Sequence, residues 1–202
     1  MRCRPEMMRL YAVTDRAWTK KKSLIEQVEE AICGGATCIQ LREKNLDEEA
    51  FLREAIEMQK LCETYQVPLI INDHVEIAKH CKAAGVHLGQ KDMEAGRAMI
   101  LGVSARTVEQ AVQAELAGAD YLGVGAVFQT STKTDAKEIS HAILKEICES
   151  VNIPVVAIGG IGKQNIEALA GSGIAGVALV SAVFAAEDIE QECRGLLKQI
   201  ER

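Results

Sequence analysis

Eight short segments recur along the chain, seven of them largely apolar and one alternating, and helical patterns separate most of them. The segments cover residues 10–14, 37–44, 69–71, 86–88, 100–103, 121–124, 155–158 and 175–180. Nearly continuous apolar runs are typical of parallel strands that are buried on both faces. Eight such strands alternating with helices predict an α/β fold, a (β/α)8 (TIM) barrel of small size, and the count disfavours a doubly wound sheet. We expect residues 1–202 to form one such domain, because no stretch differs enough in composition to be a second.

Polar residues mark where several helices begin. Ser23 is followed three residues later by Glu26, and Asp47 and Thr107 precede further helical patterns. One unit differs from the rest, because residues 93–98 leave room for only one or two helical turns. The fourth helix of the barrel is therefore expected to be shortened.

Charge and cysteine usage limit the partners and the compartment. A net charge of -6 argues against a nucleic-acid surface, so an anionic ligand would need local cations. No apolar run is long enough to span a bilayer, and the N-terminus is too short and too charged for a signal peptide. Seven cysteines without a Cys-x-x-Cys pair suggest neither a zinc ribbon nor a disulfide framework, which favours the cytoplasm. A homo-oligomer is compatible with the sequence but not specified by it.

The stretch 37–44 carries alternating polar and apolar residues. Gln40, Arg42 and Lys44 share one parity, and Ile39 and Leu41 share the other, so the two groups lie on opposite faces of a strand. Among buried strands the polar face must look into the interior. Two inward cations without a counter-charge would each cost several kcal/mol, and they therefore indicate an anionic ligand.

Two aspartates follow neighbouring predicted strands, at the end of the barrel where active sites of this fold lie. Asp73 follows the third strand and Asp92 the fourth. Each alone reads equally well as a helix N-cap. Together, beside Arg42 and Lys44, they suit Mg²⁺, which prefers one or two protein carboxylates and completes its shell with water and phosphate oxygens.

A second anion site is predicted at the ends of the last two strands. Gly159-Gly160 and Val180-Ser181 occupy the common phosphate site of the fold, where backbone N–H groups meet an anion. The polar loop after the sixth strand is longer than its neighbours and contains residues 130–133, which offer hydroxyl groups and one cation.

The histidines add no nucleophile or base to this reading. His87 alternates with Val86 and Leu88 and is predicted to be a core histidine, and the other three histidines read as surface residues. Two anion sites, one of them with a metal, facing one mouth indicate a reaction that joins or rearranges two phosphorylated small molecules.

Nine short motifs follow one another in order along nearly the whole chain. They are residues 10–15 (LYAVTD), 40–44 (QLREK), 71–73 (IND), 85–92 (GVHLGQKD), 102–104 (GVS), 118–121 (GADY), 130–133 (TSTK), 157–161 (AIGGI) and 176–181 (GVALVS). Each motif alone is weak, but the ordered set resembles the thiamine phosphate synthase (thiamine-phosphate pyrophosphorylase) family.

The resemblance implies a transferase of thiamine biosynthesis. Such an enzyme joins 4-amino-2-methyl-5-(diphosphooxymethyl)pyrimidine, here the pyrimidine diphosphate, to a thiazole phosphate, giving thiamine phosphate and diphosphate. The reaction would be dissociative: diphosphate departs, and the thiazole nitrogen traps the resulting pyrimidine-methyl cation.

The resemblance also implies roles for individual residues. The pyrimidine diphosphate would be held by Gln40, Leu41, Arg42, Glu43, Lys44, Asn72, Ser104 and Lys133. The thiazole phosphate would be held by Thr130, Ser131, Thr132, Gly160, Val180 and Ser181. Asp73 and Asp92 would hold the Mg²⁺ cofactor, and the catalytic residues would be Arg42, Lys44, Ser104 and Lys133.

Two features depart from the family's pattern. Ala126 and Gln129 stand where prolines are usual around the long loop, and residues 93–98 lack most of the expected fourth helix. The related thiazole tautomerase is an alternative, although the retained Arg42 and Lys44 argue against it, because a tautomerase has no diphosphate to bind. A non-catalytic phosphate-binding barrel is a further alternative, supported only by the short fourth unit.

Overall fold

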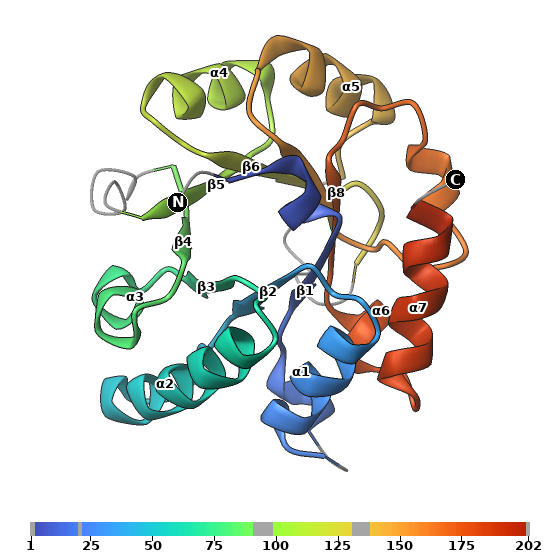
Figure 1. The fold of residues 1–202 in the computed structure, drawn as a ribbon. Coiled ribbons are helices and arrows are strands. Elements are labelled where there is room, and N and C mark those ends of the chain that lie inside the picture. Colours follow the sequence, from blue (N-terminus) through green and yellow to red (C-terminus); the bar gives the residue numbers. More distant parts are fainter. Residues whose placement is uncertain (1–2, 20–21, 91–98, 131–137, 201–202) are drawn as a thin grey trace.

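Eight parallel strands close into a barrel in chain order, with β1 paired to both β2 and β8 (Figure 1). The computed structural model describes residues 3–19, 22–90, 99–130 and 138–200. The strands are β1 (Leu10–Val13), β2 (Cys38–Leu41), β3 (Leu69–Asn72), β4 (Gly85–Leu88), β5 (Ile100–Ala105), β6 (Tyr121–Gly125), β7 (Val155–Ile158) and β8 (Gly176–Leu179). The predicted TIM barrel is confirmed, and each strand overlaps its predicted segment. The second strand is shorter than predicted, because it ends at Leu41 and leaves Arg42 and Lys44 in the loop beyond it.

Helices surround the strands in an outer ring (Figure 1). The α-helices are α1 (Leu24–Cys33), α2 (Glu48–Thr64), α3 (Val75–Cys81), α4 (Val108–Leu116), α5 (His141–Ser150), α6 (Ser181–Phe184) and α7 (Ile189–Ile200). Short 3-10 turns are η1 (Pro5–Met8), η2 (Arg16–Trp18) and η4 (Ile166–Leu169). The shortened fourth helix predicted for residues 93–98 lies outside the described residues.

The predicted helix starts follow from the capping side chains. Ser23 and Glu26 form a reciprocal capping box at α1, and the Asp47 and Thr107 side chains accept backbone hydrogen bonds at the first turns of α2 and α4. These contacts satisfy N–H groups that a helix leaves without an internal partner. Side chains close in sequence therefore mark where these three helices begin.

Two apolar layers hold the barrel together. The larger layer lies between the strands and the helices and includes Val28, Phe51 and Met58. The smaller layer fills the barrel interior and includes Met8, Tyr11 and Tyr121. The turn η1 carries Met8 and packs against β1 and β8, so it covers the amino-terminal end of the barrel and leaves the carboxyl end as the open one.

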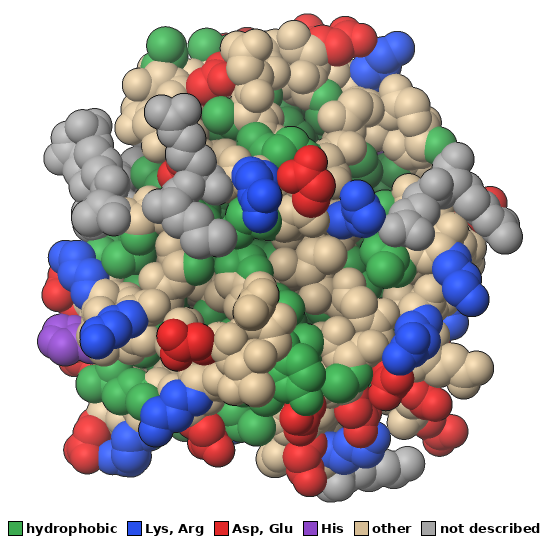
Figure 2. Space-filling model, viewed as in Figure 1, with side chains coloured by type: hydrophobic (Ala, Val, Ile, Leu, Met, Phe, Trp, Pro, Cys, Tyr) green, Lys and Arg blue, Asp and Glu red, His purple; other side chains and the backbone are tan. Residues whose placement is uncertain are grey.

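The surface is mixed in charge. Acidic and basic side chains are interspersed on the face shown in Figure 2. Within the described ranges, no helix combines the length and apolar character needed to cross a membrane.

Candidate active site

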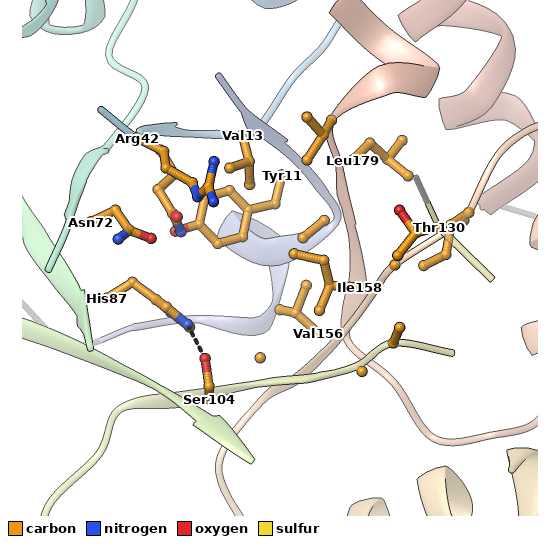
Figure 3. A pocket seen from close by; sticks show the side chains of 18 of the residues that line it. Tyr11, Val13, Arg42, Asn72, His87, Ser104, Thr130, Val156, Ile158 and Leu179 are labelled. Atoms are coloured by element: carbon orange, nitrogen blue, oxygen red, sulfur yellow. Dashed lines mark hydrogen bonds between the residues drawn. The ribbon is translucent and has the colours of Figure 1, made fainter. Parts of the chain in front are cut away.

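A cavity of about 420 Å³ lies at the carboxyl ends of the strands and reaches into the barrel (Figure 3). Ten predicted site residues line it: Gln40, Arg42, Lys44, Asn72, Asp73, Ser104, Thr130, Gly160, Val180 and Ser181. Figure 3 shows Arg42, Asn72 and His87 on one side and Thr130 and Leu179 on the other. Segments far apart in the sequence thus meet in one space because the strand ends of a closed barrel face the same mouth.

The end of β2 supplies two of the cationic side chains that line the cavity, and Arg106 after β5 is another. The Thr14 hydroxyl accepts a hydrogen bond of 3.0 Å from the Arg42 backbone N–H, which fixes the chain where it leaves the strand. Arg42 is half-buried and Lys44 is exposed. Among the described residues, neither side chain forms an ion pair. Two cations without a protein counter-charge at one rim favour an anionic ligand.

Leu41 and Glu43 lie on the opposite parity and do not line the cavity. Leu41 is fully buried among the apolar residues between strands and helices. The Glu43 carboxylate accepts a hydrogen bond of 2.9 Å from Arg16 Nε, and Arg16 also binds the Glu54 carboxylate at 2.6 Å. Burial raises the pKa of Glu43, and Arg16 partly opposes that shift. Leu41 and Glu43 therefore anchor the end of β2 through packing and an ion pair.

Oxygen ligands gather at the end of β3. Asn72 and Asp73 line the cavity, and Asp73 adopts a left-handed backbone conformation with φ of 64°. Its backbone N–H donates to the His87 carbonyl at 2.9 Å. Asp92, predicted as the second metal ligand, lies outside the described residues. In the part of the chain that is described, no cluster of three His, Cys, Asp or Glu side chains could hold a metal alone.

The glycine pair after β7 lets the long loop approach the strand. A Cβ atom on Gly159 would lie 2.6 Å from the Ala126 Cβ, and one on Gly160 would lie 2.3 Å from the Gln129 carbonyl oxygen. The Val127 and Phe128 N–H groups donate to the Ile158 and Gly159 carbonyls, each at 3.0 Å. The glycines thus bring Thr130 to the cavity wall. Ser131, Thr132 and Lys133 lie outside the described residues.

A chain of hydrogen bonds crosses the inside of the barrel beneath the cavity. The Gln40 Nε2 donates to the Tyr11 hydroxyl at 2.8 Å, and the Tyr11 and Tyr121 hydroxyls lie 2.8 Å apart. The Tyr121 hydroxyl lies 3.1 Å from His87 Nδ1, and His87 Nε2 lies 3.0 Å from the Ser104 Oγ (Figure 3). These five residues, Gln40, Tyr11, Tyr121, His87 and Ser104, are called the barrel chain below.

Sequence reasoning missed the middle of the barrel chain. Tyr11 and Tyr121 stand in apolar strands and read as core residues, and His87 is predicted to be a core histidine. The two tyrosines are buried and His87 is largely buried, and in addition all three line the cavity, which the sequence does not indicate. The inward parity of His87 was the available signal, since β4 pairs His87 with Asn72 on one side and Gly102 on the other.

Burial sets the protonation of the barrel chain. It lowers the pKa of His87 to about 4, so the imidazole is neutral at pH 7. Burial is also the main cause that raises the pKa of Tyr11 and Tyr121 well above the usual range, so each hydroxyl keeps its proton. The chain therefore joins neutral groups and can orient a ligand without adding charge.

Cations at the end of β2 and an amide and a carboxylate at β3, opposite a glycine-bordered wall at β7 and β8, are features of a barrel enzyme that handles phosphorylated small molecules. The sequence matches the family model described as thiamine monophosphate synthase over residues 10–183. The chain belongs to this family.

Named relatives agree with the family match. Thiamine-phosphate synthases of Clostridium tetani and Ruminiclostridium cellulolyticum are 47% and 48% identical to the chain; the alignments cover 93% and 94% of it, and 93% of each relative. The solved thiamine phosphate pyrophosphorylase from Pyrococcus furiosus superposes with a TM-score of 0.89 at 38% identity, covering 98% of this chain and 97% of that one.

Proposed function

We propose that this protein joins the pyrimidine diphosphate to a thiazole phosphate and releases diphosphate, forming thiamine phosphate. The observation that carries the proposal is one cavity with two separate places for anions. Arg42 and Lys44 stand at β2, while Gly160, Val180 and Ser181 border the cavity at β7 and β8. Two phosphorylated substrates can therefore bind in the same cavity with their phosphate groups on opposite sides of it.

The β2 side suits the leaving diphosphate. The Arg42 guanidinium can donate two parallel hydrogen bonds to phosphate oxygens, and Lys44 adds a second positive charge. Both side chains line the cavity, and the Thr14 hydroxyl anchors the Arg42 backbone N–H where the chain leaves β2. The charge that develops on the diphosphate as the carbon–oxygen bond breaks would be stabilised by groups in place beforehand.

The residues at β3 fit Mg²⁺. The Asp73 carboxylate offers hard oxygen atoms to the cavity, and within the described residues it has no hydrogen bond or ion pair of its own. We propose that Asp73, together with Asp92, holds the ion. When bound, it would neutralise charge on diphosphate oxygens.

The chemistry needs no protein nucleophile. Cleavage of the bond between the pyrimidine methylene carbon and the diphosphate oxygen sends the electron pair to diphosphate. The ring nitrogen of the thiazole then forms the new carbon–nitrogen bond. The protein holds both partners in line, which is a contribution of position and charge. Ser131 and Thr132 are proposed to complete the thiazole side, and Lys133 the side that holds the pyrimidine diphosphate.

Incubation of the protein with both substrates and Mg²⁺ tests the proposal. We expect thiamine phosphate and diphosphate in equal amounts, and no thiamine phosphate when either substrate is left out. A folded sample that yields no thiamine phosphate with any thiazole phosphate form would disprove the synthase function.

The Arg42→Ala variant tests, in the same assay, whether the diphosphate binds at the end of β2. Loss of charge-assisted hydrogen bonds should raise the KM for the pyrimidine diphosphate roughly 10- to 100-fold, with the KM for the thiazole phosphate unchanged. The circular dichroism spectrum should match that of the wild type. A collapse of the fold would instead mean that Arg42 has a structural partner.

A further inference from the structure

The barrel chain links Gln40 to Ser104 through hydrogen bonds, and the number of protons that each group can donate limits the direction of those bonds. Each tyrosine hydroxyl has one proton to donate, and a neutral imidazole donates from one nitrogen and accepts at the other. The four contacts, between 2.8 and 3.1 Å, are all hydrogen-bond distances. When each hydroxyl and the imidazole both donate once and accept once within the chain, all the donors point the same way along it.

The direction follows from the Gln40 amide. Its Nε2 donates to the Tyr11 hydroxyl, and the single Tyr11 proton is accordingly assigned to Tyr121 and the Tyr121 proton to His87 Nδ1. His87 then carries its proton on Nε2 and donates to the Ser104 Oγ. The Cys38 thiol also lies beside the Tyr11 hydroxyl, but sulfur is a weak acceptor and does not compete with the Tyr121 oxygen.

The two ends of the chain then present opposite groups to the cavity. Gln40 has its amide oxygen left as an acceptor, and Ser104 has its hydroxyl proton left as a donor. Gln40 and Ser104 both line the cavity. A ligand that bridges them must offer a donor at one end and an acceptor at the other.

The surrounding backbone makes room for this arrangement. A Cβ on Gly102 would lie 2.1 Å from the Tyr121 Cζ, and one on Gly123 would lie 2.9 Å from the His87 Cε1. Two glycines on adjacent strands thus accommodate the two central rings. The Tyr11 and Tyr121 rings also meet edge to face at 5.9 Å between centroids. The rings are held by packing as well as by their hydrogen bonds.

We propose that Tyr11, Tyr121 and His87 are positioning residues that fix Gln40 as an acceptor and Ser104 as a donor, and so select a pyrimidine with an exocyclic amino group over its oxo counterpart. The inference rests on the proposed function. An amino group donates to the Gln40 oxygen, whereas an oxo group would face it as a second acceptor and leave both unpaired.

The Tyr121→Phe variant removes the central hydroxyl and keeps the ring. We expect kcat/KM for the 4-amino pyrimidine diphosphate to fall, and its preference over the 4-oxo analogue to shrink roughly tenfold, because Gln40 and Ser104 are no longer coupled. The KM for the thiazole phosphate should not change. Tyr11→Phe should behave in the same way. Tyr65→Phe, the same change at an exposed tyrosine bonded to Glu29, should alter none of these values.

An unchanged amino-over-oxo preference in folded Tyr121→Phe and Tyr11→Phe would overturn the proposal. A second measurement needs no substrate and separates this failure from failure of the proposed function. Nitrogen-15 NMR of histidine-labelled wild type, assigned with His87→Gln, should show a neutral His87 protonated on Nε2. Protonation on Nδ1 would mean that the chain runs the other way, and it would overturn the inference even in an active enzyme.

Discussion

Alternate residues at the end of β2 have different surroundings. Gln40, Arg42 and Lys44 reach the cavity, while Leu41 and Glu43 turn away from it. Alternation in the sequence predicts this division. It does not predict the partner of Glu43, because Arg16 lies 27 residues earlier in another strand-end loop and no local spacing marks it.

Arg16→Ala should destabilise the protein through Glu43. We expect the free energy of unfolding to fall by about 1–2 kcal/mol at pH 7, because a nearly buried carboxylate loses its cation. Burial already raises the pKa of Glu43 above 4.5, and the loss of Arg16 should raise it further. A carboxyl group whose pKa is higher in the folded than in the unfolded protein stabilises the fold below pH 4.5. That contribution to the free energy of unfolding is lost as the pH rises through the pKa of the folded protein. The cost of the substitution should therefore be smaller at pH 5 than at pH 7.

Urea unfolding at the two pH values measures this difference. Arg53→Ala is the matched control, since Arg53 pairs with an exposed glutamate on the surface of α2 and should cost less than about 0.5 kcal/mol. An Arg16→Ala cost that is the same at both pH values would show that Glu43 is not the group responsible.

Strands β5 and β6 show how one element is shaped for its neighbour. Gly102 pairs in register with Tyr121, and the absent side chain of Gly102 is the space that the tyrosine ring fills. Ser104, two residues further along β5, points to the same face and reaches the cavity. A glycine inside a strand looks unfavourable when that strand is considered alone. The reason for Gly102 becomes clear only when the strand pairing places Tyr121 beside it.

Gly102→Ala should therefore act through the Tyr121 ring. Overpacking is expected to lower the free energy of unfolding by about 1–3 kcal/mol and to reduce activity by displacing the barrel chain. In the Tyr121→Leu background the shorter side chain leaves room, so the Gly102→Ala cost should shrink by at least about 1 kcal/mol. Strictly additive costs in denaturant unfolding would refute the steric explanation.

At the scale of the molecule, the sequence predicts the barrel and ten of the residues that line the cavity. Apolar runs, caps and strand-end polar residues are local signals, so the strands and residues such as Arg42, Asp73 and Ser181 could be placed in advance. The barrel chain could not be found in this way, because Tyr11 and Tyr121 are 110 residues apart and meet only through closure and register. Asp92, Lys133 and the shortened helix at 93–98 lie outside the described residues and stay predictions.

The most direct test of the account is a crystal structure with thiamine phosphate, diphosphate and Mg²⁺ bound. We predict diphosphate against Arg42 and Lys44, the phosphate of thiamine phosphate beside Gly160 and Ser181, and the pyrimidine amino group within hydrogen-bond distance of the Gln40 oxygen. Diphosphate at the β7 and β8 end, or either product bound outside the cavity, would contradict the assignment of the two anion sites.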